Sequence, residues 1–182
     1  KDISGLNYRL AGEVIGAANE VVPMILKGGG IKNTLIISPP GAGKTTMLRD
    51  IVRQLSYKSY RVSVVDERSE IAALCEGRSA FDLGFSTDVL EGVDKAEGML
   101  MVLRSMSPDV IVTDEIGKQS DIDAIERITN SGAAVIATIH GRNIDMIKRR
   151  DDLKRMLKFF DLIITLSKRK GIGTVEEALT EW

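Results

Sequence analysis

The stretch Ser38-Pro39-Pro40-Gly41-Ala42-Gly43-Lys44-Thr45-Thr46 decides the fold class, because it joins an apolar run to a helical pattern. The run of residues 34–38, which leads into this stretch, is short, mostly apolar and rich in β-branched side chains. Residues 47–55 after it place their apolar side chains on one helical face. A glycine-rich turn between a strand and a helix is the context that a phosphate-binding loop requires. Gly41 and Gly43 allow the main chain to approach phosphate groups closely.

The chemistry of this loop follows from its residue types. Successive N–H groups point inward, and the helix N-terminus adds positive potential. Lys44 supplies a charge for the β- and γ-phosphates, and the Thr45 hydroxyl is placed to ligate Mg²⁺. Ser38 replaces the first glycine of the full pattern G-x-x-x-x-G-K-[ST]. The residues predicted to bind the nucleotide are Pro40, Gly41, Ala42, Gly43, Lys44, Thr45 and Thr46.

Length and composition indicate one ordinary folded domain. The 182 residues include 25 Lys and Arg against 26 Asp and Glu, a formal charge of −1. This balance excludes a generic polyanion binder, so a nucleic-acid role must rest on a local patch. A hydrophobic fraction of 43% excludes wholesale disorder. The single Cys75 excludes an internal disulfide framework and fits a reducing cytosol, and no apolar run reaches the roughly 18 residues that cross a bilayer.

Short apolar runs alternate with helical patterns along the chain, which predicts an α/β fold with a mostly parallel central sheet flanked by helices. The predicted strands are residues 34–38, 61–65, 110–113, 133–139 and 162–166. One predicted helix starts after Lys44, and three more cover residues 96–106, 121–129 and 153–157. Ser120 is the predicted N-cap of the helix over residues 121–129.

The N-terminal segment is set apart by a glycine run. Residues 14–26 are predicted to be helical with Pro23 as an interruption, and Gly28-Gly29-Gly30 then breaks the pattern. Residues 1–30 are therefore interpreted as an N-terminal helical segment and linker, a remnant of a truncated neighbouring domain. Residues 31–182 are interpreted as the nucleotide-binding domain.

Two acids end the predicted strand 110–113. Hydrolysis of a nucleotide needs one carboxylate near Mg²⁺ and one that orients or deprotonates water. Asp114 is expected to hold the magnesium shell together with Thr45, and Glu115 to face the attacking water. A strand end holds both side chains within a narrow geometry.

A second acidic cluster, Asp66-Glu67-Arg68-Ser69-Glu70, follows the predicted strand 61–65, at the edge where open α/β sheets bind ligands. It is either a solvated turn or a second set of acids, with Asp66 on the metal and Glu67 or Glu70 in catalysis. The only histidine, His140, follows the predicted strand 133–139 and is a candidate sensor of the γ-phosphate.

These four elements, in this order, resemble the secretion-type ATPases of type II secretion, type IV secretion and type IV pili. That family carries a phosphate loop, an acidic "Asp box", a Walker B strand and a "His box". They correspond here to residues 38–46, 66–70, 110–115 and 138–140. The resemblance implies a RecA-like P-loop NTPase fold, with ATP and Mg²⁺ as ligands.

Among the relatives of these secretion-type ATPases, this chain most resembles the stage III sporulation protein AA family. The resemblance implies an ATPase of the channel between mother cell and forespore in endospore-forming bacteria. The matching stretches are Asn7-Tyr8-Arg9, Leu48-Arg49-Asp50, Val65 to Ala72, Thr87-Asp88-Val89-Leu90 and Asp114-Glu115-Ile116-Gly117.

Two departures from the secretion ATPases leave the acid that activates water open. Secretion ATPases often have Gly-Glu where this chain has Asp114-Glu115, and their Asp box usually reads Glu-Asp-Pro-x-Glu. Here the order of the acids is swapped and Arg68 replaces the proline. Glu115 is the first candidate for the acid that activates water, and Glu67 or Glu70 the second.

The resemblance also implies a homo-hexamer with sites at subunit boundaries, where an arginine from a neighbour stabilises charge. It implies membrane channel proteins of the sporulation apparatus as partners, and a cytoplasmic protein recruited to the mother-cell face of the membrane rather than inserted. ATP is the expected nucleotide, because no guanine-recognition element follows a strand. The candidate arginines are Arg9, Arg78, Arg104 and Arg142.

Two other functions remain open from the sequence. A nucleic-acid motor of RecA-like fold would use the basic run in residues 148–170, which holds nine of the 25 basic residues. Aromatic residues that could stack on bases are scarce at 4%, and Phe159 and Phe160 are expected in the core, so no nucleic acid is expected. A nucleotide-gated scaffold would bind ATP to assemble without turnover.

Overall fold

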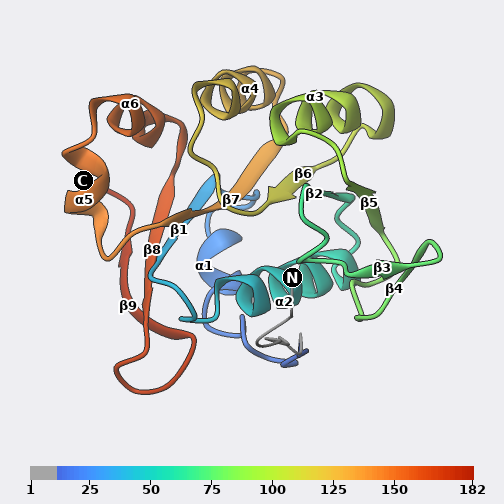
Figure 1. Ribbon diagram of the computed structural model, residues 1–182, viewed down its shortest axis with the longest axis horizontal. Helices are drawn as coiled ribbons and strands as arrows, with labels where there is room; N and C mark the ends of the chain where they lie inside the picture. Colours follow the sequence, from blue (N-terminus) through green and yellow to red (C-terminus); the bar gives the residue numbers. More distant parts are fainter. Residues whose placement is uncertain (1–11) are drawn as a thin grey trace, which may run out of the picture.

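A seven-stranded sheet crosses the molecule in the order β5-β2-β6-β7-β1-β8-β9 (Figure 1). The computed structural model describes residues 12–182. Neighbouring strands from β5 to β8 pair in parallel, and β9 pairs antiparallel with β8. The strands of this sheet are β1 (Thr34–Ser38), β2 (Val62–Asp66), β5 (Thr87–Glu91), β6 (Val110–Thr113), β7 (Ala134–His140), β8 (Leu162–Ser167) and β9 (Thr174–Leu179). The predicted α/β class with a mostly parallel sheet is confirmed.

Helices cover both faces of the sheet, as Figure 1 shows. Alternate residues of the central strands enter two separate cores: Leu35 and Ile37 of β1 face one core, and Ile36 faces the other. One face carries α3 (Lys95–Met106), α4 (Gln119–Asn130), α5 (Ile144–Lys148), α6 (Asp151–Lys154) and the 3₁₀ helix η1 (Arg155–Phe159). The other carries α1 (Val22–Ile25) and α2 (Lys44–Tyr57).

The strand order determines which side chains can meet. The strand β7 lies between β1 and β6, and its last residue His140 is in register with Ser38 at the end of β1. Since β1, β2, β6 and β7 are parallel, their carboxyl ends lie at one edge of the sheet. The loops that leave these four ends therefore share one surface.

The prediction of a helix over residues 14–26 is wrong for most of its length. Only Val22–Ile25 is helical, and turns occupy the residues before it. Pro23 lies in the first turn of α1, where its missing N–H has no helical partner to lose, so it does not interrupt a helix. Ala18, Val21 and Ile25 are nonetheless fully buried in the same core as α2. The boundary at residue 30 stays a prediction.

The N-cap of α4 also differs from the prediction. The helix begins at Gln119, so that Ser120 lies inside it, and the cap position is Lys118. The Asp121 carboxylate reaches back and accepts hydrogen bonds from the N–H groups of Gly117 and Lys118, both at 2.9 Å. The start of α4 is therefore stabilised by an acid of its first turn that binds the residues before the helix, and not by a serine at the cap position.

The sequence did not indicate two pairs of strands. The strands β5 and β9 lie at the two edges of the sheet and are only partly buried, so their hydrophobic pattern is weak. The hairpin of β3 (Leu74–Cys75) and β4 (Arg78–Ser79) stands apart from the main sheet. The remaining strand and helix predictions agree with the structure within a few residues, except that residues 153–157 divide between α6 and η1.

Candidate functional site

The glycine-rich loop has the shape that its sequence indicates. It leaves β1 at Ser38 and enters α2 at Lys44, with Gly43 in the N-cap position. Gly41 and Gly43 have φ angles of +67° and +91°, which other residues rarely adopt. The N–H groups of the first turn of α2 have no helical partners, so this end of the helix can receive an anion.

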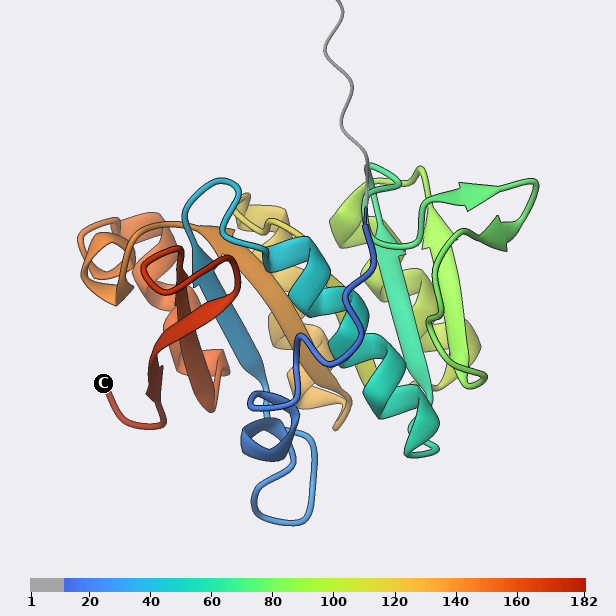
Figure 2. The same cartoon turned by 90° about the horizontal axis from the view of Figure 1, so that it is seen from below.

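The loop between β8 and β9 braces the glycine-rich loop, a contact that the sequence did not reveal (Figure 2). Gly173 donates its N–H to the carbonyl oxygen of Ala42 at 3.0 Å. A side chain at Gly41 would meet Lys168 Nζ at 3.0 Å, and one at Gly43 would meet Ile172 at 2.9 Å. Gly43 is therefore favoured by the limited space as well as by its backbone angle, whereas at Gly41 the backbone angle is the main constraint because the Lys168 side chain can move aside.

The structure brings Lys44 and Glu115 together from two strands that are not adjacent. Lys44 Nζ lies 3.8 Å from Glu115 Oε2, across the end of β7. The turn that carries Glu115 is attached to β7, because Thr138 accepts the Glu115 N–H through its hydroxyl at 2.9 Å and the Ile116 N–H through its carbonyl at 2.8 Å. Thr138 is fully buried, so this attachment is rigid.

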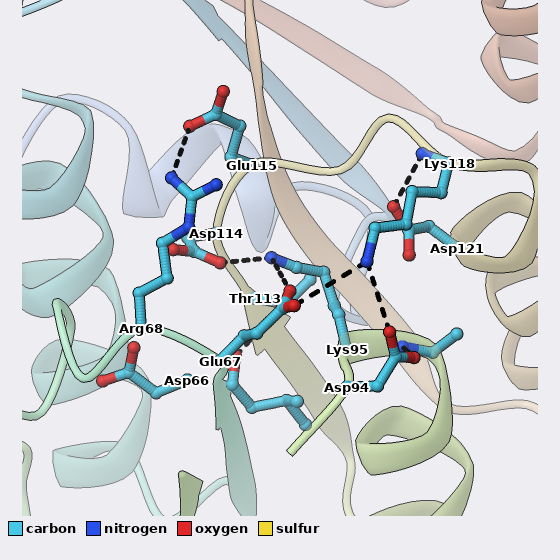
Figure 3. Close-up of polar contacts among 12 residues, drawn as sticks. Asp66, Glu67, Arg68, Asp94, Lys95, Thr113, Asp114, Glu115, Lys118 and Asp121 are labelled. Carbon is cyan, nitrogen blue, oxygen red and sulfur yellow. Dashed lines mark hydrogen bonds and ion pairs between the residues drawn. The ribbon is translucent and has the colours of Figure 1, made fainter. Parts of the chain in front are cut away.

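Asp114 is paired with a buried lysine that the sequence analysis did not select. Lys95, the first residue of α3, is 3% exposed and hydrogen-bonds Asp114 Oδ1. Its Nζ also lies 3.6 Å from Glu67 Oε2, so one cation bridges the ends of β2 and β6 (Figure 3). A buried charge is costly without a partner, and Lys95 and Asp114 supply each other's counter-charge.

A second lysine extends this network to the surface. Lys118 Nζ lies 3.7 Å from Glu67 Oε1 and 3.3 Å from Asp94 Oδ2 (Figure 3). The hydrogen bond to Asp94 and the nearby charge of Glu67 raise the pKa of Lys118. Asp94 is also the N-cap of α3, and hydrogen bonds from the Glu97 amide and from Lys118 lower its pKa. Glu67 therefore lies between two cations.

Asp66 and Glu70 are placed differently from Glu67. Asp66 is fully buried, and its two carboxylate oxygens accept the backbone N–H groups of Glu70, Ile71 and Ala72 at 2.8–2.9 Å. Through these hydrogen bonds, Asp66 holds the turn that follows β2. The Glu70 side chain is exposed, and its carbonyl oxygen accepts a hydrogen bond from Arg49.

The Leu48-Arg49-Asp50 motif on α2 also contacts the turn after β2. The buried Arg49 guanidinium donates to the carbonyl oxygens of Gly12, Glu70 and Ile71 at 2.6–2.7 Å. Asp50 accepts the Ala18 N–H at 2.8 Å and thereby attaches the N-terminal turns to α2. These two side chains hold neighbouring segments against the helix of the phosphate loop.

Glu67, Glu115, Arg68 and His140 line one cleft of about 390 Å³, together with Lys95 and Lys118. His140 is exposed at the end of β7, and the N–H of the following Gly141 donates to the Ser38 carbonyl at 3.2 Å. His140 is thus adjacent to the start of the phosphate loop. The cleft brings together residues that the sequence placed in three separate motifs.

The donor set suits Mg²⁺ bound with a nucleotide. Within residues 12–182 no group of three or more His, Cys, Asp and Glu side chains could hold a metal ion by itself. Magnesium at phosphate sites characteristically uses one or two protein oxygens, with phosphates and waters filling the other positions. Thr45 and Asp114 offer one hydroxyl and one carboxylate of this kind.

The other candidate residues lie away from the cleft or outside the described part. Arg78 is exposed in the β3–β4 hairpin, and Arg104 donates to the Leu100 carbonyl of its own helix. Arg9, like the Asn7-Tyr8-Arg9 motif, lies outside residues 12–182. In that described range, no helix has both the length and the apolarity to cross a membrane.

Solved structures with a similar fold include an ATPase and a pilus retraction motor. The ATPase DotB of Legionella pneumophila has a TM-score of 0.58 at 22% identity, over 74% of this chain and 40% of DotB. The pilus retraction motor PilT, solved with bound ADP, has a TM-score of 0.60 at 20% identity, over 81% of this chain and 45% of PilT. The fold is therefore that of the RecA-like P-loop ATPases.

Sequence comparison identifies the family. Stage III sporulation protein AA of Bacillus subtilis (strain 168) is 40% identical over 184 residues, which cover 97% of this chain and 60% of that protein. This chain thus spans about 60% of the length of its curated relative. The family model described as "Sporulation stage III, protein AA" matches residues 1–181. The chain belongs to the sporulation stage III protein AA family.

Proposed function

We propose that this chain binds ATP between the phosphate loop and the end of β6 and hydrolyses it. The observation that carries the proposal is the 3.8 Å separation between Lys44 Nζ and Glu115 Oε2. Hydrolysis requires a group that holds the terminal phosphate and a carboxylate beside it that orients water. The two side chains come from different strands and meet at the place where both are needed.

Each predicted site residue is assigned a role in this proposal. Residues 40–46 hold the phosphates through backbone N–H groups, and Thr45 and Asp114 hold Mg²⁺, which when bound neutralises phosphate charge. Glu115 orients and deprotonates water, and His140 contacts the terminal phosphate. Glu67 remains the second candidate for the acid, although its carboxylate is already paired with Lys95 and Lys118.

At the level of the cell, we propose that turnover drives assembly or transport through a membrane channel complex during endospore formation. Membership of the sporulation family and the fold shared with DotB and PilT support this. The proposed assembly is a homo-hexamer, cytoplasmic and peripheral to the mother-cell membrane. Its partners would be the channel proteins of the sporulation apparatus.

The test is Mg²⁺-dependent phosphate release from ATP by the wild type and by Lys44→Ala and Glu115→Gln. Lys44→Ala should abolish nucleotide binding, whereas Glu115→Gln should keep binding and slow release by about 10²–10⁴-fold. Lys58→Ala, the same change at the opposite end of α2, is the matched control and should leave both unchanged. A wild-type chain without phosphate release would refute hydrolysis.

The same experiment separates the two alternative functions. A nucleotide-gated scaffold would assemble with ATP and be indifferent to Glu115→Gln, as size-exclusion chromatography with light scattering would show. A nucleic-acid motor would bind single strands in a salt-dependent way and turn over faster with them. Phe160 is 4% exposed and Phe159 is partly buried against the core, so neither ring is fully exposed for base stacking.

A further inference from the structure

Arg68 occupies the proposed active site although its motif position suggested no catalytic role. It follows Glu67 in the turn after β2, and its Nη1 lies 3.8 Å from Glu115 Oε2 (Figure 3). The Arg68 side chain is 62% exposed, so its guanidinium faces both Glu115 and solvent. It also lines the cleft that Glu115 and His140 share.

Two cations therefore face one oxygen atom. Lys44 Nζ lies 3.8 Å from the same Glu115 Oε2 that Arg68 approaches, so the two cations are at most about twice that distance apart. A phosphate group held by Lys44 beside Glu115 lies within reach of the Arg68 guanidinium. Guanidinium groups bind phosphate oxygens in a bidentate manner, whereas an ammonium acts as a point charge.

The base of the Arg68 turn is rigid, while its side chain is not confined. Asp66 holds the backbone of residues 70–72 through three hydrogen bonds, and Arg49 binds the carbonyl oxygens of Glu70 and Ile71. The turn is thus attached to β2 and to α2, the helix that begins with Lys44. Arg68 and Lys44 approach the same site from within one chain.

We propose that Arg68 is a catalytic residue that acts within its own subunit and contacts the terminal phosphate of the bound nucleotide. This inference rests on the proposed ATP hydrolysis. Binding of the triphosphate exchanges the Arg68–Glu115 contact for an Arg68–phosphate contact, which leaves Glu115 to orient water. The water oxygen forms a bond to the γ-phosphorus, and the bond to the bridging oxygen breaks with its electron pair remaining on ADP. The proton passes from water to Glu115 and on to solvent, while Arg68 offsets charge on the γ-phosphate oxygens.

The first experiment separates binding from turnover. In Arg68→Ala we expect kcat for phosphate release to fall about 10³-fold or more, the scale of arginine fingers, and KM for ATP to rise by no more than about 10- to 100-fold. Arg68→Lys, which keeps the charge but not the bidentate geometry, should recover part of the rate. Arg127→Ala is the control, since Arg127 is exposed in the last turn of α4, and it should retain the wild-type rate. An unchanged kcat in Arg68→Ala would overturn the proposal.

The second experiment tests whether Arg68 acts within its own subunit. Arg68→Ala and Lys44→Ala subunits are mixed, so that each chain lacks one of the two groups. If Arg68 serves its own site, every site in the mixture is defective and phosphate release stays at the level of the variants. Recovery of activity in the mixture would show that Arg68 serves a neighbouring site and would overturn the assignment.

A binding measurement keeps the inference separate from the proposed hydrolysis. Arg68→Ala should weaken the affinity for a non-hydrolysable ATP analogue by about 10- to 100-fold and leave the ADP affinity unchanged, because only the triphosphate has the contacted group. A wild-type chain that shows this discrimination without turnover would refute hydrolysis but support the Arg68 contact. Equal effects on both nucleotides, or none on either, would refute the contact.

Discussion

Replacing Asp66 by Asn tests whether this carboxylate holds the turn after β2 or ligates a metal ion. In the wild type its two oxygens accept three backbone N–H groups, from Glu70, Ile71 and Ala72. An asparagine keeps one acceptor oxygen and places an NH₂ donor where the second oxygen was. If its oxygen serves Ile71 and Ala72, the Glu70 N–H faces another donor.

The size of the effect follows from this count. A buried N–H without an acceptor costs about 1–3 kcal/mol, and the two remaining hydrogen bonds each lose roughly 0.5–1 kcal/mol with the charge. We therefore expect the free energy of unfolding to fall by about 2–5 kcal/mol. Domains are typically stable by about 5–15 kcal/mol, so a variant of a domain of average stability should still fold.

The assay is urea unfolding followed by far-UV circular dichroism, without Mg²⁺ or nucleotide. Asp88→Asn is the matched control, because Asp88 is exposed on the neighbouring strand β5, and it should change the free energy by less than about 0.5 kcal/mol. If Asp66→Asn were as stable as Asp88→Asn but bound Mg²⁺ with nucleotide more weakly, the metal role would be correct and the reasoning above refuted.

Three further predictions concern residues around the site. Burial would raise the pKa of Asp50, but hydrogen bonds led by the Ala18 amide lower it, so the stability that Asp50 contributes is present above pH 3.8 and is lost at lower pH. The gap in unfolding free energy between wild type and Asp50→Asn should therefore narrow below that pH, and a constant gap would contradict this. A lysine at position 49 cannot donate to three carbonyl oxygens with the geometry of the guanidinium, so Arg49→Lys should lower the free energy of unfolding by about 1–3 kcal/mol. An unchanged midpoint of urea unfolding would contradict this. Thr138→Val removes the acceptor of the Glu115 N–H, so phosphate release should slow about 10²-fold with unchanged nucleotide affinity, whereas a wild-type rate would show that this bond does not position Glu115.

The elements that were predicted best from the sequence are those with a pattern confined to a short stretch of chain. The central strands are continuous apolar runs because helices cover both faces, and the glycine loop has a fixed spacing to Lys44. The meeting of Lys44 with Glu115 also followed, because parallel strands place their carboxyl ends at one edge. The edge strands β5 and β9 were missed because a half-buried edge has no continuous hydrophobic run.

The N-terminal turns show a different limit. Their apolar residues recur with helical spacing, yet the segment before Val22 forms turns, with Gly16 at a φ of +89°. Burial of Ala18, Val21 and Ile25 against α2 and the bond from Ala18 to Asp50 replace helical hydrogen bonding as the stabilising force. Tertiary contacts therefore decided the local structure of a segment with a weak helical preference.

The acids of the site could be counted from the sequence, but their division into roles could not. Asp66, Glu67 and Glu70 lie within five positions, yet one holds a turn, one lies between two lysines and one points outward. The division depends on cations that are remote in sequence, because Lys95 and Lys118 reach Glu67 only after α3 and α4 have packed against the sheet. Carboxylates at a shared sheet edge repel one another, and a cation placed between two of them offsets that repulsion. A sequence motif rich in acids therefore depends on counter-charges from other elements. Glu115 differs from the other acids because both of its cations, Lys44 and Arg68, lie where they could bind a phosphate group in place of Glu115.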